Sequence, residues 1–195
     1  KHMGRTVVRG NSTQPIVIKP GQLTLASVLK KVGYATACVG KWGVGTPDNF
    51  TNPNDVGFDH FFGYVNMWHA HNFYPEFLIR NGKVEKLRNE VAPKWKRWQD
   101  PKLPQAGRGV AVKKVDYAPD LFAKDALRFI REKHKQPFFL YFAMNVPHAN
   151  NEAGGEKRIA FDGMRVPDWG SHANLDIPDQ EKGFARMIDY IDKDV

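Results

Sequence analysis

Two side chains at the predicted ends of strands, Lys41 and His148, could bind a ligand, and a third polar cluster contains His71. Lys41 follows the apolar stretch "TACVG" and lies between glycines in "CVGKWGVG". His148 follows the apolar run "PFFLYFAMNVP", and His71 lies in the loop "WHAHNFYP". In open α/β sheets ligands bind at the carboxyl ends of strands, where a lysine offers a point charge and a histidine can transfer a proton. Taken one at a time, Lys41 could be an oxyanion contact and His148 a site residue, but each is also typical of an ordinary loop.

Two other interpretations of "CVGKWGVG" are weak. A phosphate-binding loop needs a glycine five positions before Gly-Lys and a serine or threonine after it. This chain has Ala35 at the first position and Trp42 at the second. Cys38, the only cysteine, lies within an apolar strand, where a thiol is usually buried and unreactive. We therefore expect an inert core thiol, and a single cysteine excludes an internal disulfide.

The aromatic and histidine-rich loops leave alternatives open. His69 and His71 are spaced so that both could bind a metal ion, or they could only form hydrogen bonds within their loop. Residues 89–115 and 149–180 are predicted irregular excursions that line a pocket mouth. Their tryptophans could stack on sugars or simply pack against the protein: Trp95, Trp98 and Trp169.

Composition limits the classes of partner. The chain has 195 residues, enough for one domain with a core, and a formal net charge of +8. That charge allows an anionic partner, but the basic residues are dispersed and no nucleic-acid module accompanies them. We expect no nucleic-acid partner. No stretch approaches the roughly 18 apolar residues of a membrane span, and the opening "KHMGRTVVRGN" lacks a signal-peptide core.

The amino-terminal half predicts a helix, a strand and a hairpin. Thr24 can cap a helix over 24–34 whose apolar stripe is Leu25, Val28, Leu29 and Val32. The small-residue stretch 34–40 follows as a strand. Residues 46–63 resemble a loop, and residues 73–87 resemble a hairpin with Asn81-Gly82 at its turn.

The carboxy-terminal half predicts two helices around one strand. Residues 117–134 form the clearest amphipathic helix. The continuous apolar run 137–144 is typical of a central strand covered on both faces. Residues 179–195 predict a final helix with one apolar face: Phe184, Met187, Ile188 and Ile191. The order of elements indicates an α/β protein that is the middle part of a larger domain.

Read as ordered phrases, the chain resembles the sulfatase family, the sulfate-ester hydrolases of the alkaline-phosphatase superfamily. The phrases follow the family's order: "HMGRTVVRGN", "LTLASVLKKVGYATACVGKWGVG", "NPNDVGFDHFFGY", "AHNFYPEFLIRNG", "DLFAKDALRFIRE", "PFFLYFAMNVPHANNE" and "KGFARMIDYIDKDV". The resemblance implies a partial alkaline-phosphatase-like sheet, mixed but mostly parallel, flanked by helices and joined by long irregular loops. It makes residues 1–195 one incomplete catalytic domain.

The resemblance also implies roles for single residues. Lys41 matches the lysine of the family's Gly-Lys-Trp motif and would bind a sulfate oxygen and help hold the nucleophile. His148 matches the histidine after the central strand and would contact the sulfate or the leaving-group oxygen as a general acid. His71 matches a pocket-lining position. Many members have a histidine where this chain has Gly43, so that contact is absent or comes from another residue.

The family's cofactors are expected outside this chain. Members convert a cysteine in a Cys-x-Pro-Ser-Arg motif to formylglycine and use a calcium ion to neutralise the sulfate. Cys38 lacks that context, so the resemblance places the formylglycine, and the calcium with its ligands, beyond residues 1–195. No metal ligand is expected within them. The chain alone is therefore expected not to hydrolyse sulfate esters.

Two alternative functions remain open at this point. One is a phosphodiesterase or phosphonate hydrolase of the same superfamily. The other is a non-catalytic module that binds sulfated glycans through basic and aromatic loops such as "PKWKRWQD". The expected partner is a sulfated small molecule or glycan. The family favours a periplasmic, secreted or lysosomal-type location, and the oligomeric state does not follow from the sequence.

Overall fold

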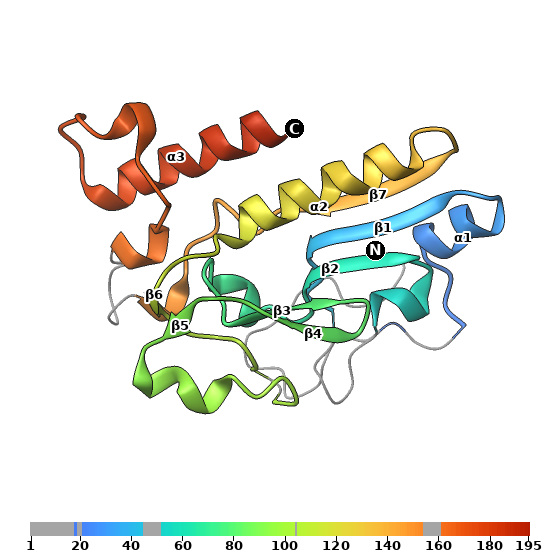
Figure 1. Ribbon diagram of the computed structural model, residues 1–195, viewed down its shortest axis with the longest axis horizontal. Helices are drawn as coiled ribbons and strands as arrows, with labels where there is room; N and C mark the ends of the chain where they lie inside the picture. Colours follow the sequence, from blue (N-terminus) through green and yellow to red (C-terminus); the bar gives the residue numbers. More distant parts are fainter. Residues whose placement is uncertain (1–17, 19–20, 45–51, 104, 154–160) are drawn as a thin grey trace.

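A computed structural model describes residues 18, 21–44, 52–103, 105–153 and 161–195, so the phrase "HMGRTVVRGN" lies outside the described residues. Within them, one five-stranded sheet has the order β4-β3-β2-β1-β7, and β5 and β6 form a second, two-stranded sheet (Figure 1). The strands are β1 Ala35–Lys41, β2 His60–Tyr64, β3 Phe77–Arg80, β4 Lys83–Lys86, β5 Glu90–Val91, β6 Ala111–Lys113 and β7 Phe138–Ala143.

The described part of the chain has fewer α-helices than strands. The α-helices are α1 Leu25–Lys31, α2 Ala118–Lys133 and α3 Asp179–Asp194. Short 3-10 turns lie between them: η1 Pro53–Val56, η2 His69–His71, η3 Pro93–Trp98, η4 Asn151–Ala153, η5 Phe161–Met164 and η6 Gly170–His172. None of the described helices is long and apolar enough to cross a membrane.

The main sheet is mixed but mostly parallel, as predicted. β1 pairs in parallel with β2 on one side and with β7 on the other. β3 is antiparallel to β2, and β4 is antiparallel to β3. Every described strand of this sheet except β3 therefore runs in the same direction, and the carboxyl ends of β1, β2 and β7 meet at one edge.

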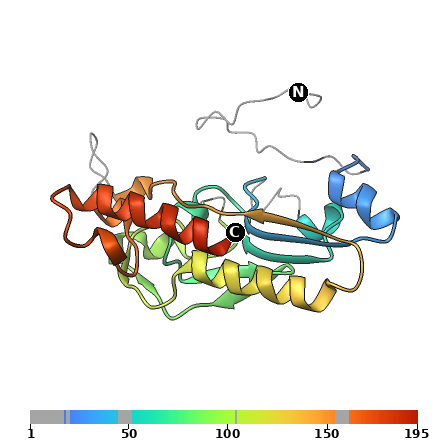
Figure 2. The same ribbon diagram turned by 90° about the horizontal axis from the view of Figure 1, so that it is seen from above.

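Adjacent residues of β1 and β2 face opposite sides of the sheet and so build two cores. Val39 and Phe62 pack with Phe122 of α2 on one face. Cys38 and Phe61 pack with Ala26 of α1 on the other face. Because successive side chains of a strand alternate in direction, a strand buried on both sides supplies both cores. Figure 2 shows α1 and α2 on opposite sides of the sheet.

Helix α1 forms where predicted, but the prediction of its buried face is wrong. Thr24 caps it through a reciprocal pair of 3.0 Å hydrogen bonds with Ser27. The buried residue is Ala26, whereas Leu25 is 62% and Val28 is 44% exposed. A Cβ atom on Gly57 would lie 2.3 Å from the Ser27 backbone nitrogen. The helix therefore packs closely through small residues, which a count of large apolar residues does not detect.

Helix α3 also forms where predicted, but its buried residues differ from the apolar face that the sequence predicted. Met187 is fully buried, but Phe184 and Ile188 are each 44% exposed. Gly183 and Tyr190 are buried instead, and a Cβ atom on Gly183 would lie 2.1 Å from a backbone oxygen of Met164. Because Gly183 has no side chain, α3 can approach the backbone of Met164 closely. This close contact determines which face of α3 is buried.

Two strand predictions need correction. Residues 46–63 were expected to be a loop, yet β2 begins at His60 and lies in the middle of the sheet. The run 137–144 was expected to be a central strand, yet β7 lies at the edge of the described sheet, and its Tyr141 is 45% exposed. An apolar run shows what a strand is able to bury, but it does not show which strands lie beside it.

The remaining elements follow the sequence more closely. Residues 118–133 form the predicted amphipathic helix α2, and His134 ends it. β3 and β4 form the predicted hairpin, with Asn81 at φ 47° and Gly82 at φ 79° in the turn. Such positive φ values at both central positions are what Asn-Gly favours. Residues 89–115 contain β5 and β6 and are thus more ordered than a simple surface excursion.

A buried carboxylate ties α2 to the sheet. Asp125 has a side chain only 4% exposed and accepts hydrogen bonds of 2.6 Å from both Arg80 and Arg128. His60 Nε2 lies 2.5 Å from its other oxygen. Burial alone would raise the pKa of Asp125, but the hydrogen bonds from His60, Arg128 and Arg80 hold it well below its usual range.

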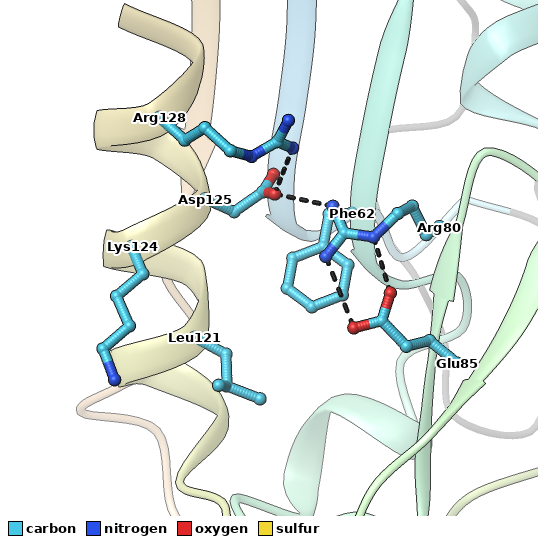
Figure 3. A pocket seen from close by; sticks show the side chains of 7 residues that line it. All are labelled: Phe62, Arg80, Glu85, Leu121, Lys124, Asp125 and Arg128. Carbon is cyan, nitrogen blue, oxygen red and sulfur yellow. Dashed lines mark hydrogen bonds and ion pairs between the residues drawn. The ribbon is translucent and has the colours of Figure 1, made fainter. Parts of the chain in front are cut away.

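The same cluster lines a pocket of about 230 Å³ between α2 and the β3–β4 hairpin (Figure 3). Arg80 stacks over the Phe62 ring at 3.8 Å and also pairs with Glu85. The charged groups of this pocket largely neutralise one another. The pocket is therefore best explained as a structural junction, and it is not formed by the predicted anion-binding residues.

Cys38 is expected not to react with thiol reagents in the folded protein. It is fully buried in β1, and burial raises its pKa to about 12, so very little thiolate forms near neutral pH. Iodoacetamide at about pH 8 should leave the native protein unmodified and should alkylate the same protein rapidly in denaturant, as followed by mass spectrometry. Rapid alkylation of the native protein would contradict an inert core thiol.

Replacing Asp125 by asparagine is expected to lower the free energy of unfolding by about 3 kcal/mol at neutral pH, because Arg80 and Arg128 then lose the buried carboxylate that accepts their hydrogen bonds. The folded-state pKa is depressed, so this stability is present above the unfolded pKa of about 4 and is lost as the pH falls below it. Urea unfolding at several pH values should show the difference between wild type and Asp125→Asn shrinking in acid.

The matched control for this measurement is Glu132→Gln. Glu132 pairs with the same Arg128, but its side chain is 52% exposed. Exposed pairs contribute about 0.5 kcal/mol or less. An equal loss of unfolding free energy in Asp125→Asn and Glu132→Gln would show that Asp125 is not the main contact between α2 and the sheet.

Candidate active site

The candidate site lies at the carboxyl edge of β1, β2 and β7. The register pairs Gly40 with Gly63 of β2 and with Ala143 of β7, and it pairs Lys41 with Tyr64. The strands end at the same level, so the loops that follow them share one edge of the sheet. Sequence reasoning anticipated this geometry for Lys41 and His148.

Two glycines allow the strands to come together at this edge. A Cβ atom on Gly40 would lie 2.0 Å from the backbone oxygen of Ala143. A Cβ atom on Gly63 would lie 1.9 Å from the backbone oxygen of Gly40. Gly40 has a φ of 108° and Gly63 has a φ of 157°. No other residue type fits Gly40 without moving the strand that precedes the site.

Lys41 ends β1 in a half-buried position. Burial lowers the pKa of its ammonium from the ordinary value, because a less hydrated environment disfavours the charged form. The chain then continues along β2, since Trp42 and Gly43 donate backbone hydrogen bonds of 2.9 Å to Tyr64 and Val65. A poorly hydrated ammonium at this place gains more from an approaching anion than one in water.

Gly43 adopts a φ of 72°, a conformation that L side chains rarely adopt. A Cβ atom built there would lie 3.7 Å from Lys41 Cε and 3.5 Å from Met67 Cγ. A side chain at this position would thus lie beside the lysine. Because Gly43 has no side chain, it does not cover that side of Lys41.

Turn η2 carries His71 to the same edge. The Tyr64 hydroxyl donates a 2.7 Å hydrogen bond to the carbonyl of Asn72. Asn145, just after β7, donates a 2.8 Å hydrogen bond to the carbonyl of Ala70. These two contacts fasten the loop to the ends of β2 and β7 and place His71 beside the segment that bears His148.

His71 and His148 form a parallel stack. Their ring centroids lie 5.1 Å apart with an interplanar angle of 6°. His148 is exposed, and its Nδ1 lies 2.7 Å from the carbonyl oxygen of Ala149. The fold therefore brings together two of the three predicted site residues, and Lys41 reaches the same edge from β1.

His69 takes no part in this site. It is 1% exposed, and its ring lies 4.9 Å from Tyr64 and 4.5 Å from Phe77 between centroids. Burial lowers its pKa to about 3, so the ring is neutral. Across the described ranges no group of three His, Cys, Asp or Glu side chains could hold a metal ion. Neither interpretation of the His69–His71 pair describes both residues, because His69 is a buried core residue and His71 contacts Glu152 outside its loop.

Sequence reasoning missed two charged residues at the site. Glu152, whose side chain is 3% exposed, lies 3.1 Å from His71 Nδ1 through Oε2. Arg108 Nη2 lies 3.4 Å from the Oε1 of the same carboxylate. Glu152 follows His148 closely in "PHANNE", but an acidic residue in a predicted loop gives no sign that it is buried.

The tryptophans of residues 89–115 surround Arg108. The guanidinium carbon lies 5.2 Å from the ring centroids of Trp68 and Trp95 and 5.5 Å from that of Trp98. Trp169 similarly faces Lys182 at 5.0 Å. These contacts favour the packing role for the tryptophans over sugar stacking, because the protein's own cations lie on their rings.

Comparison with known proteins agrees with this fold. The family model described as Sulfatase matches residues 2–192. An arylsulfatase of Hemicentrotus pulcherrimus is 30% identical over 146 residues, which cover 66% of this chain and 22% of the relative. An N-acetylgalactosamine-6-sulfatase of Rattus norvegicus is 32% identical over 133 residues, which cover 64% of this chain and 22% of the relative. The chain thus matches about a fifth of the length of these relatives.

A solved structure shares the fold. Ps i-CgsB, determined in complex with k-i-k-neocarrahexaose, superposes with a TM-score of 0.56 at 24% identity over 87% of this chain and 34% of that chain. The mixed, mostly parallel sheet flanked by helices is therefore the alkaline-phosphatase-like arrangement that the sequence predicted. Because the family model spans nearly all of its residues, the chain belongs to the sulfatase family.

Proposed function

We propose that this chain is part of a sulfuric ester hydrolase that acts on an aryl sulfate or a sulfated carbohydrate. The observation that carries the proposal is the parallel stack of His71 on His148 at the sheet edge that Lys41 also reaches. The family match supports this activity over both alternatives, a phosphoryl-transfer enzyme and a non-catalytic glycan-binding module.

The three side chains have complementary roles in this proposal. A sulfate ester carries negative charge, and hydrolysis shifts further charge onto the leaving oxygen, so fixed cations and proton donors stabilise the transition state. Lys41 binds a sulfate oxygen as a point charge from its half-buried position. His148 donates a proton to the leaving-group oxygen, and His71 contacts the sulfate beside it. Gly43 leaves room for the substrate next to Lys41.

The family's cofactors enter the proposal as parts that other segments supply. Calcium would neutralise the sulfate, and formylglycine would provide the attacking group. Residues described in the structure do not fit either role, because they contain no metal-binding group of three side chains and Cys38 is buried inside a strand. The family resemblance leads us to place both beyond residues 1–195 and to treat these residues as one incomplete catalytic domain. The family also favours a periplasmic, secreted or lysosomal-type location.

Replacing Lys41 by alanine in the longer protein that contains this chain is expected to lower kcat/KM for an aryl sulfate by about 100-fold. That is the usual scale for losing one contact to developing charge in a transition state. Hydrolysis of a chromogenic aryl sulfate measures the effect. The control is Lys31→Ala, an exposed lysine of α1, which should retain the wild-type rate. A wild-type rate for Lys41→Ala would remove this residue from the site.

The isolated chain of residues 1–195 is expected to show no turnover of aryl sulfates, because the nucleophile is proposed to lie elsewhere. The purified chain and the longer protein should be assayed side by side at equal concentration, with and without added calcium. Turnover by the isolated chain that the Lys41→Ala substitution abolishes would show that the chain contains its own nucleophile. That result would refute the proposed division of the site.

A further inference from the structure

The carboxylate of Glu152 is buried against a ring nitrogen of His71. Its two oxygens lie 3.1 and 3.4 Å from Nδ1, and its side chain is 3% exposed. His71 is itself 8% exposed. A carboxylate accepts hydrogen bonds and an imidazole nitrogen donates only when it carries a proton, so this contact requires the proton on Nδ1.

The carboxylate is held by contacts other than the histidine. Arg108 supplies the compensating charge at 3.4 Å, which a buried carboxylate needs. Asn150 accepts a 3.1 Å hydrogen bond from the Glu152 backbone nitrogen through its side chain. Its own side-chain nitrogen donates at 2.8 Å to Gly109, the neighbour of Arg108. The acid and its arginine are thus fixed together before any ligand binds.

The neighbouring histidine is held in the same way by a different group. His148 Nδ1 lies 2.7 Å from the Ala149 carbonyl oxygen, and a carbonyl oxygen only accepts. Both rings of the stack therefore carry their proton on Nδ1. In each ring Nε2 remains as the atom that can accept a proton or, once protonated, donate one to a ligand.

We propose that Glu152 is a positioning residue that fixes His71 in the Nδ1–H tautomer, so that His71 and His148 both offer Nε2 to the oxygens of one oxyanion. Arg108 holds the carboxylate in place. The inference rests on the proposed function for the identity of the oxyanion, a sulfate ester. In this proposal the loop of residues 105–109 and turn η4 contribute to catalysis only by positioning His71.

A double-mutant cycle in the longer protein tests the kinetic part. Glu152→Gln keeps the size of the side chain and removes its charge. We expect it to lower kcat for an aryl sulfate by about 10- to 100-fold, the range for losing a group that orients a functional histidine, with a smaller change in KM. In a His71→Ala background the same substitution should change kcat by less than about twofold, because the residue it positions is gone.

The controls separate positioning from folding. Glu181→Gln, an exposed acid in the first turn of α3, should leave kcat unchanged. Glu152→Asp keeps the charge on a shorter side chain and should recover part of the rate lost in Glu152→Gln. Should Glu152→Gln fail to fold, the same cycle is measured with Glu152→Asp. An equal loss of kcat in both backgrounds, or no loss in either, overturns the proposal.

A spectroscopic readout tests the tautomer without relying on activity. Long-range ¹H–¹⁵N correlations of the longer protein labelled in its histidines report which ring nitrogen carries the proton, and the His71→Ala variant identifies the resonances. We expect His71 to be protonated on Nδ1 in the wild type and to lose that preference in Glu152→Gln. An unchanged tautomer overturns the proposal even if the enzyme is active. An Nδ1–H tautomer in a protein that hydrolyses no sulfate ester would instead count against the proposed function.

Discussion

The contact between glycine backbones at the end of β1 is the constraint on which the rest of the site depends. Gly40 lies so close to β7, and Gly63 so close to Gly40, that a Cβ atom on either would overlap a backbone oxygen at about 2 Å. This tight pairing brings the carboxyl ends of three parallel strands to one level. Lys41, the loop of His71 and the loop of His148 follow from those ends.

Two buried carboxylates, Asp125 and Glu152, stabilise different parts of the molecule. Asp125 lies on α2 and accepts a hydrogen bond from Arg80 of β3, so it fixes the helix to the sheet. Glu152 lies at the opposite, functional edge and contacts a histidine and Arg108. Each is viable only because a guanidinium compensates the cost of burying its charge. One of them supports the fold, and the other supports the geometry of the site.

The backbone at Gly43 limits which side chains could stand beside Lys41. This residue has a φ of 72°, and the position of its missing side chain points toward Lys41. A histidine there would need an unfavourable backbone conformation in this fold. On the neighbouring loops, His71 and His148 form a stacked pair of imidazoles.

Periodicity and turn chemistry in the sequence were enough to predict α1, α2, α3, β1 and the β3–β4 hairpin. These elements depend on local rules such as the Thr24 cap and the Asn81-Gly82 turn. The strand that begins at His60 escaped prediction because its short apolar run follows a stretch of turn residues. The buried faces of α1 and α3 escaped because close approach through Ala26 and Gly183 outweighs large apolar side chains.

For the candidate site, too, some features follow from the sequence and others only from tertiary contacts. The sequence by itself determined the family and pointed to Lys41, His71 and His148, because residue type and order along the chain carry that information. Only the tertiary structure decided that the two histidines stack and that Glu152 is buried against one of them. Those contacts join residues about 80 positions apart, and burial of a charge depends on partners that no local pattern reveals.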